Sequence, residues 1–305
     1  VRYDGSLKAS VILKDLAPFV PALSRFEEPL DLNLVFSGHG KHLDCPTLRL
    51  TNHHGLMIAG EAALSNWDAG MDMYIYGKLG NLTMTKEGIN VLMTNLTGKV
   101  PPILQRLDYI RFNGEAAGYL HDLTLTGLFH TGAGMVKTDV MMSIDEQSMS
   151  RTYSGSVASA DLDLGKLLNQ EKKFGKVDFN VELKGFNYKN RYPESYIKGI
   201  ISSFEYSQYQ YENIMLDGVY KDGGFNGRLS MDDANGSVQI DGNFNVAKTI
   251  PDFNLKASVK NLRPHDLHLS DKYENASISL DLTADFTGKS IDDMNGRISL
   301  DSLQL

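Results

Sequence analysis

Four histidines and one cysteine are the residues whose types and spacing come nearest to a chemical site. His39, His42, Cys45, His53 and His54 lie close together in the chain. Zinc needs about four such ligands at defined spacing, with a second shell that orients them. Here the histidines stand beside glycines, as turn residues do. We therefore expect neither a metal nor any other cofactor at this cluster.

Carboxylates are the other residues that could carry chemistry. Asp161, Asp163 and the pairs at 232–233 and 292–293 do not have the spacing of a calcium loop. Each of the two pairs is followed closely by Asn-Gly, as in turns. Catalytic serine signatures, phosphate-binding loops and dinucleotide-binding glycines are absent from the sequence. Carboxylates are numerous, but nothing in the sequence singles out two of them as the catalytic pair of a glycosidase. The sequence predicts a protein that is not an enzyme and has no catalytic residues.

Composition narrows the class of protein further. The chain has 305 residues and a net charge of −8, without the basic stripe that a nucleic-acid surface needs. No apolar run is long enough to span a bilayer, and one cysteine excludes an intrachain disulfide. Both ends fall inside alternating patterns, so we expect a segment of a longer protein. We expect residues 1–305 to form one continuous β-rich segment, with 1–150 and 151–305 as sub-units within it.

Alternation of apolar and polar residues is the main signal of the elements. It is clearest over residues 197–246, where Asp-Gly and Asn-Gly pairs mark tight turns. Strand patterns recur at intervals of about 8–15 residues without long helices. We predict an all-β fold: an elongated, curled, mostly antiparallel sheet with an apolar groove and a few short helices. The expected helices are 15–23, 161–168 (or a turn) and 100–110, whereas 82–84 and 89–92 read as strands around a turn at 86–88.

Glycines fall at the same alternate positions of the strands as the apolar residues, so they belong to the apolar face. A glycine weakens a strand unless curvature or close approach requires it, and a dry face that lacks side chains can curl toward that face. Individual glycines also fit bulges or strand ends. The glycines concerned are Gly38, Gly60, Gly127, Gly155, Gly185, Gly199, Gly218, Gly227, Gly242, Gly288 and Gly296.

Repeated units in the chain resemble the periplasmic repeats of the TamB (translocation and assembly module) family, within the AsmA-like group, in the form of its Bacteroidetes branch. The units are 179–185, 197–206, 211–218, 225–233, 262–267 and 291–298. The resemblance covers most of the chain and is strongest from about residue 153. It implies a β-taco, an open curled sheet with an apolar trough. It also implies a periplasmic location, anchoring to the inner membrane by a segment outside this chain, phospholipid movement, and an outer-membrane barrel partner.

Physical reasoning agrees with the resemblance at one point. An apolar trough can hold acyl chains, since each buried CH₂ contributes about 0.8 kcal/mol, and a uniform lining lets a lipid slide. The expected lining residues of this lipid groove are Phe179, Val181, Leu183, Ile197, Ile201, Ile214, Leu216, Phe225, Leu229, Met231, Val238, Ile240, Phe244, Val246, Phe253, Leu255, Val259, Ile278, Leu280 and Leu282.

Three functions fit the sequence. The first is a periplasmic bridge that conducts phospholipid acyl chains between the inner and outer membranes. The second is an envelope scaffold that pairs an open sheet edge with a strand of a barrel partner during outer-membrane protein assembly. The third is a carbohydrate-binding β-sandwich, for which the tyrosines between 188 and 220 would form a stacking platform. We favour the first.

Overall fold

The computed structural model describes residues 2–17, 24–145, 147–148, 150–187, 194–245, 248–272, 274–289 and 293–304. The chain divides into two compact units. Unit 1 comprises Val1–Ser143 with Lys166–Leu168, and unit 2 comprises Ile144–Gly165 with Asn169–Leu305. Each unit is described separately.

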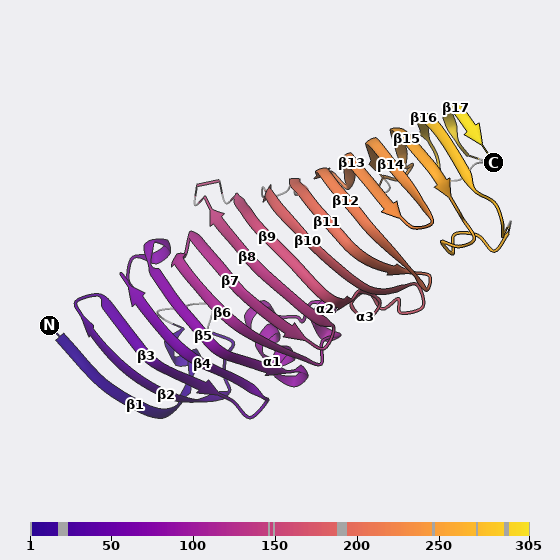
Figure 1. The fold of residues 1–305 in the computed structure, drawn as a ribbon. Helices are drawn as coiled ribbons and strands as arrows, with labels where there is room; N and C mark the ends of the chain where they lie inside the picture. The colour runs from indigo at the N-terminus through magenta and orange to yellow at the C-terminus, as the bar shows by residue number, and fades with distance from the viewer. Residues whose placement is uncertain are drawn as a thin grey trace. The chain divides into compact units, whose positions relative to one another are not determined.

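Unit 1 is built on eight strands among the described residues, and each pairs with the next in an antiparallel register. Short loops join most of them, so the strands follow one another across the sheet in chain order (Figure 1). The strands are β1 (Arg2–Ile12), β2 (Pro29–His39), β3 (His42–Thr51), β4 (Leu56–Ser65), β5 (Tyr74–Thr85), β6 (Tyr109–Tyr119), β7 (Asp122–Thr131) and β8 (Gly134–Ile144).

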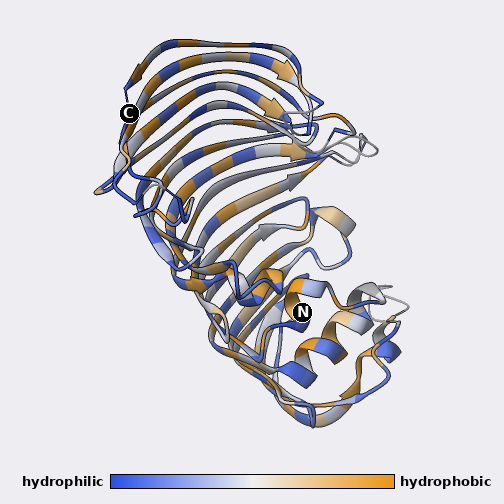
Figure 2. Ribbon diagram, turned by 90° about the vertical axis from the view of Figure 1, so that its right-hand side faces the viewer, coloured by the Kyte–Doolittle hydropathy of each residue, from blue (hydrophilic) through white to orange (hydrophobic). Residues whose placement is uncertain are grey.

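Unit 2 repeats this plan with nine strands in its described part, again paired in sequence and antiparallel. The strands arc, and hydrophobic and hydrophilic residues alternate along them (Figure 2). The strands are β9 (Arg151–Asp163), β10 (Phe174–Asn187), β11 (Glu194–Tyr206), β12 (Tyr209–Lys221), β13 (Gly224–Asp233), β14 (Gly236–Asn245), β15 (Asp252–Leu262), β16 (Ile278–Thr287) and β17 (Asn295–Gln304).

The predicted fold class is confirmed: the protein is all-β, with open, curled, antiparallel sheet and few short helices. Three α-helices occur in the described residues, α1 (Lys86–Thr97), α2 (Pro102–Gln105) and α3 (Leu164–Leu168). Short 3₁₀ turns cover Leu13–Leu16 and Gly70–Asp72. Of the helix expected at 15–23, residues 18–23 lie outside the described residues.

Two local predictions in unit 1 were wrong. The segment 86–92 is not a turn and a strand but the start of α1, which is capped by Thr85 and ends at Gly98 in a left-handed conformation. The helix expected at 100–110 is only the single turn of α2. It stops because Tyr109 opens β6, where pairing with both β5 and β7 satisfies the backbone along the whole strand.

Close approach of neighbouring strands explains the glycines on the apolar face. Gly218, Gly227 and Gly242 lie directly opposite one another across β12, β13 and β14. A Cβ built on Gly242 would lie 2.3 Å from the carbonyl oxygen of Asn254 on β15. In unit 1, a Cβ on Gly114 would lie 2.3 Å from the carbonyl oxygen of Thr126. Neighbouring backbones therefore approach closely at these points of the apolar face, and only glycine leaves room there.

Candidate binding site on the apolar face

The registers of unit 2 place the predicted lining residues on one face. Leu216, Leu229 and Ile240 are cross-strand neighbours on β12, β13 and β14. The pattern continues on both sides, through Gly199 to Val181 and through Ala257 to Leu282. Val246 lies outside the described residues. The other members of the predicted set all lie on this apolar face.

Exposure separates this face from an ordinary core. Every described residue of the predicted lining is half-buried, neither sealed nor fully exposed. Among the described residues, the strands of unit 2 pair edge to edge in one sheet, and no second sheet is stacked on its apolar face. The apolar side chains of unit 2 thus form a continuous, half-buried face.

The opposite face of unit 2 carries a ladder of charged residues beside the exposed apolar side chains of Ile200 and Met215. Lys198, Asp217, Arg228 and Asp241 stand opposite one another on β11 to β14. Lys198 Nζ lies 3.3 Å from Asp217 Oδ2, and Arg228 Nε donates to Asp241 Oδ1 at 2.8 Å. A hydrogen bond from Tyr196 and then one from Lys198 lower the pKa of Asp217. This ladder favours water on that face and opposes a register slip that would exchange the two faces.

A loop closes one rim of the apolar face in unit 2. Leu267 has no exposed surface, and its carbonyl oxygen accepts a hydrogen bond from Tyr211 Oη at 2.7 Å. Beside it, Tyr209 Oη donates to Asp233 Oδ1 at 2.5 Å. Burial, followed by this hydrogen bond, raises the pKa of Tyr209 to about 12. These tyrosines serve the protein's own packing; Tyr188 and Tyr192, also considered for sugar stacking, lie outside the described residues.

In unit 1 a helix covers part of that unit's own apolar face. The apolar residues of β2 to β8 continue across the unit in register, and α1 lies inside the curve of the strands (Figures 1 and 2). Ile89 anchors the helix, with 1% of its surface exposed, above β5 and β6. Leu30, Leu56 and Ile110 on the strands are buried as well.

A small chamber remains between α1 and the sheet. It has a volume of about 150 Å³. Hydrocarbon side chains form nearly all of its wall, and three polar residues, Glu28, Asn52 and Asn95, complete it. The apolar wall consists of Leu13, Phe26, Leu30, Leu50, Leu56, Ile58, Val91 and Leu92.

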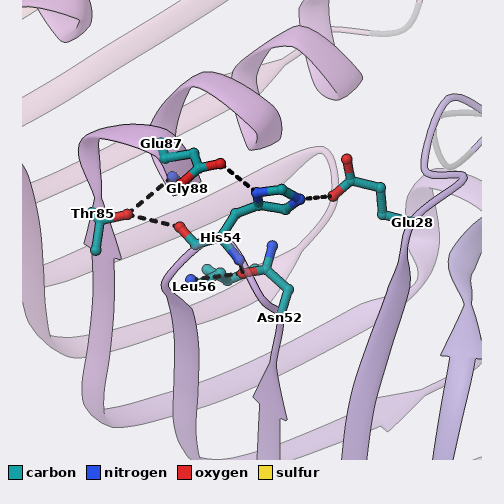
Figure 3. A network of polar contacts seen from close by, with 7 residues as sticks. All are labelled: Glu28, Asn52, His54, Leu56, Thr85, Glu87 and Gly88. Carbon is teal, nitrogen blue, oxygen red and sulfur yellow. Dashed lines mark hydrogen bonds and ion pairs between the residues drawn. The ribbon is translucent and has the colours of Figure 1, made fainter.

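His54 ties the chamber's surroundings together (Figure 3). Its Nδ1 lies 2.7 Å from Glu87 Oε1 on α1, and its Nε2 lies 3.1 Å from Glu28 Oε2 beside β2. Asn52 Oδ1 accepts hydrogen bonds from the backbone N–H groups of His54 and Leu56, which fixes the turn between β3 and β4. The hydrogen bond to Glu87, and then the charges of Glu28 and Glu87, raise the pKa of His54, while desolvation lowers it.

The described residues give no indication of a metal site or of a helix that spans a membrane. No group of three or more His, Cys, Asp or Glu side chains gathers there as a metal site. No described helix is both long and apolar enough to cross a membrane. His42 instead contacts Ser65 and Asp44, and Cys45 is buried on the apolar face of β3.

Comparison with known proteins identified no protein similar to this chain. No family model matches the chain, and neither a curated protein nor a solved structure matches it. The site must therefore be interpreted from its own geometry.

Sequence reasoning missed α1, the chamber beneath it and the bridge through His54. One local signal was present: Thr85 and Gly98 bracket a segment in which Ile89 and Leu92 share a helical face. Glu28, His54 and Glu87 are far apart in sequence, and no local pattern links them.

Proposed function

We propose that the apolar face of this protein binds the acyl chains of phospholipids and lets them slide along the strands. In this proposal the protein is part of a periplasmic bridge between the inner and outer membranes of a Gram-negative envelope, as its resemblance to the TamB family implies. The inner-membrane anchor would belong to a segment outside this chain. A barrel in the outer membrane would be its partner.

One observation carries the proposal: each described lining residue of unit 2 is half-buried on a face that the fold leaves without a second layer. A protein that used these residues only as a core would bury them. An acyl chain laid on this face would complete their burial at about 0.8 kcal/mol for each CH₂ removed from water. No charged side chain of the outer ladder faces the guest, so the phosphate head would stay in water.

Adjacent substitutions on β13 test this proposal. Leu229→Asp puts a carboxylate on the apolar face, whereas Ser230→Asp puts the same group on the opposite face. Native mass spectrometry should detect phospholipid bound to the wild-type protein and to Ser230→Asp. Leu229→Asp should lose bound lipid and lipid transfer between vesicles while its circular dichroism spectrum is kept. Equal lipid binding by both folded variants would contradict the proposal.

A second candidate function is strand pairing with a barrel partner. It rests on the sheet, which is open rather than closed into a barrel and therefore has edge strands. Backbone N–H and C=O groups on its outer edge can receive another strand. Photo-crosslinking from β17 in cells should capture a barrel protein if this function operates, and capture of lipid alone would count against it. The closed sandwich that a carbohydrate-binding function requires is not formed by the described strands, which make a single layer in each unit.

A further inference from the structure

We propose that the chamber beneath α1 in unit 1 binds the end of an acyl chain, and that the bridge Glu28–His54–Glu87 controls its mouth according to pH. The identity of the guest rests on the proposed function. The chamber and its bridge are properties of unit 1 alone.

The size and lining of the chamber define the guest. Its volume of about 150 Å³ is enough to hold one benzene-sized molecule. Leu50, Leu56 and Ile58 form the floor, and Val91 and Leu92 on α1 form the roof. This space suits the last few methylenes of an acyl chain that lies on the same apolar face.

The bridge stands at the polar side of this chamber. Glu28 and Asn52 belong both to the chamber wall and to the network around His54 (Figure 3). The imidazole joins the segment before β2, through Glu28, to the first turn of α1, through Glu87. Breaking either contact would remove one tie between α1 and the segment that carries Phe26 into the chamber wall.

Charge decides whether the bridge holds. The carboxylates that face His54 are Glu28 and Glu87; His53, its neighbour in the turn, is exposed, and Lys86 on α1 acts on Asp108 instead. Protonated His54 donates a hydrogen bond to Glu87 and forms an ion pair with Glu28, whose buried Oε2 lies 3.1 Å from Nε2. Neutral His54 donates to only one and presents a lone pair to the other.

The sign of the pH dependence follows from the direction of the shift. The pKa of His54 is raised from its ordinary value of 6.5 in the bridged structure. The bridge therefore has its full strength below that ordinary value and weakens as the pH rises through the raised pKa. Acid closes the mouth of the chamber, and alkali opens it.

Benzene is a suitable probe because its charge does not change with pH. Methyl NMR of the whole chain should show saturable benzene-induced shifts at Leu56 and Ile58. The apparent affinity should rise about threefold between about pH 5.5 and about pH 8.5, the effect of one exposed ion pair. Val91→Phe should fill the chamber and abolish the shifts, whereas Thr94→Phe, on the exposed side of α1, should keep them.

Two variants isolate the bridge. His54→Gln cannot titrate, so its affinity for benzene should be the same at both pH values. Glu28→Gln removes the repulsion that opens the mouth and should reduce the pH effect, which provides a test if His54→Gln does not fold. The inference is overturned if the wild-type shifts are absent, if they persist in Val91→Phe, or if the pH effect persists in folded His54→Gln.

A separate arm distinguishes this inference from the proposed function. A lysophosphatidylcholine, whose head group keeps its charge over this range, should shift the methyl groups of Leu229 in unit 2 at both pH values. Shifts at Leu229 without any benzene response in unit 1 overturn the chamber and leave the proposed function standing. A gated benzene response without any lysolipid shift at Leu229 supports the chamber and its bridge but removes the lipid as the guest.

Discussion

Gly242→Ala is the substitution that tests most sharply why the sheet curls. Its backbone has φ +147°, a conformation that side chains rarely adopt. An added Cβ would lie 2.3 Å from the carbonyl oxygen of Asn254 and 2.5 Å from Leu255 Cα. Because both atoms belong to the backbone of β15, no side-chain rotation relieves the contact.

The expected cost has two parts. Strain at this backbone conformation costs about 1–3 kcal/mol, and forcing the added methyl against β15 costs about 1–3 kcal/mol more. The alanine stabilises the folded state by about 0.4–1 kcal/mol through the lower entropy of its unfolded chain. We expect Gly242→Ala to lower the free energy of unfolding by about 1–6 kcal/mol.

Gly77→Ala is the matched control. Gly77 lies on the apolar parity of β5, its φ is not positive, and a Cβ there meets nothing within 4 Å. Its free energy of unfolding should equal or slightly exceed that of the wild type, measured by urea denaturation with circular dichroism. Equal stability of Gly242→Ala and Gly77→Ala would refute the argument that close strand approach requires the glycine.

Two further predictions concern the polar contacts of the rims. The pKa of Tyr209 is raised to about 12, so the wild type should lose stability as the pH rises from about 10 to about 12. Tyr209→Phe cannot ionise and should not show this loss. Urea midpoints across this range measure it, and an identical alkaline slope in both proteins would contradict it. Thr85→Ala removes the side-chain oxygen that accepts a hydrogen bond from the Gly88 N–H at 3.2 Å. Hydrogen exchange should then show α1 destabilised by about 0.5–2 kcal/mol. Unchanged protection of α1 would rule out this cap as a source of stability.

Much of the architecture was predictable because strands carry a period of two. Alternation assigned Leu216, Leu229 and Ile240 to one face, and the observed registers place them side by side. Glycines on that parity indicated curvature, and Gly242 shows the close approach behind it. These features are local, so a pattern within a single strand was sufficient to find them.

The helices were less predictable because short apolar runs are ambiguous. In α1, Gly88 and the β-branched Ile89 and Val91 favour a turn and a strand by propensity, yet the cap at Thr85 and packing on the sheet produce a helix. The opposite occurred after α2, where strand pairing overrode the helical spacing. The bridge through His54 depends on three segments that meet only in the fold.

Photo-crosslinking from the two faces of β14 tests the central claim most directly. Ile240 lies on the apolar face and its neighbour Gln239 on the opposite face. A benzophenone amino acid at each position, irradiated with phospholipid vesicles, should label phospholipid from position 240 and not from position 239. Equal labelling from both positions, or none from position 240 in a folded protein, would contradict the account.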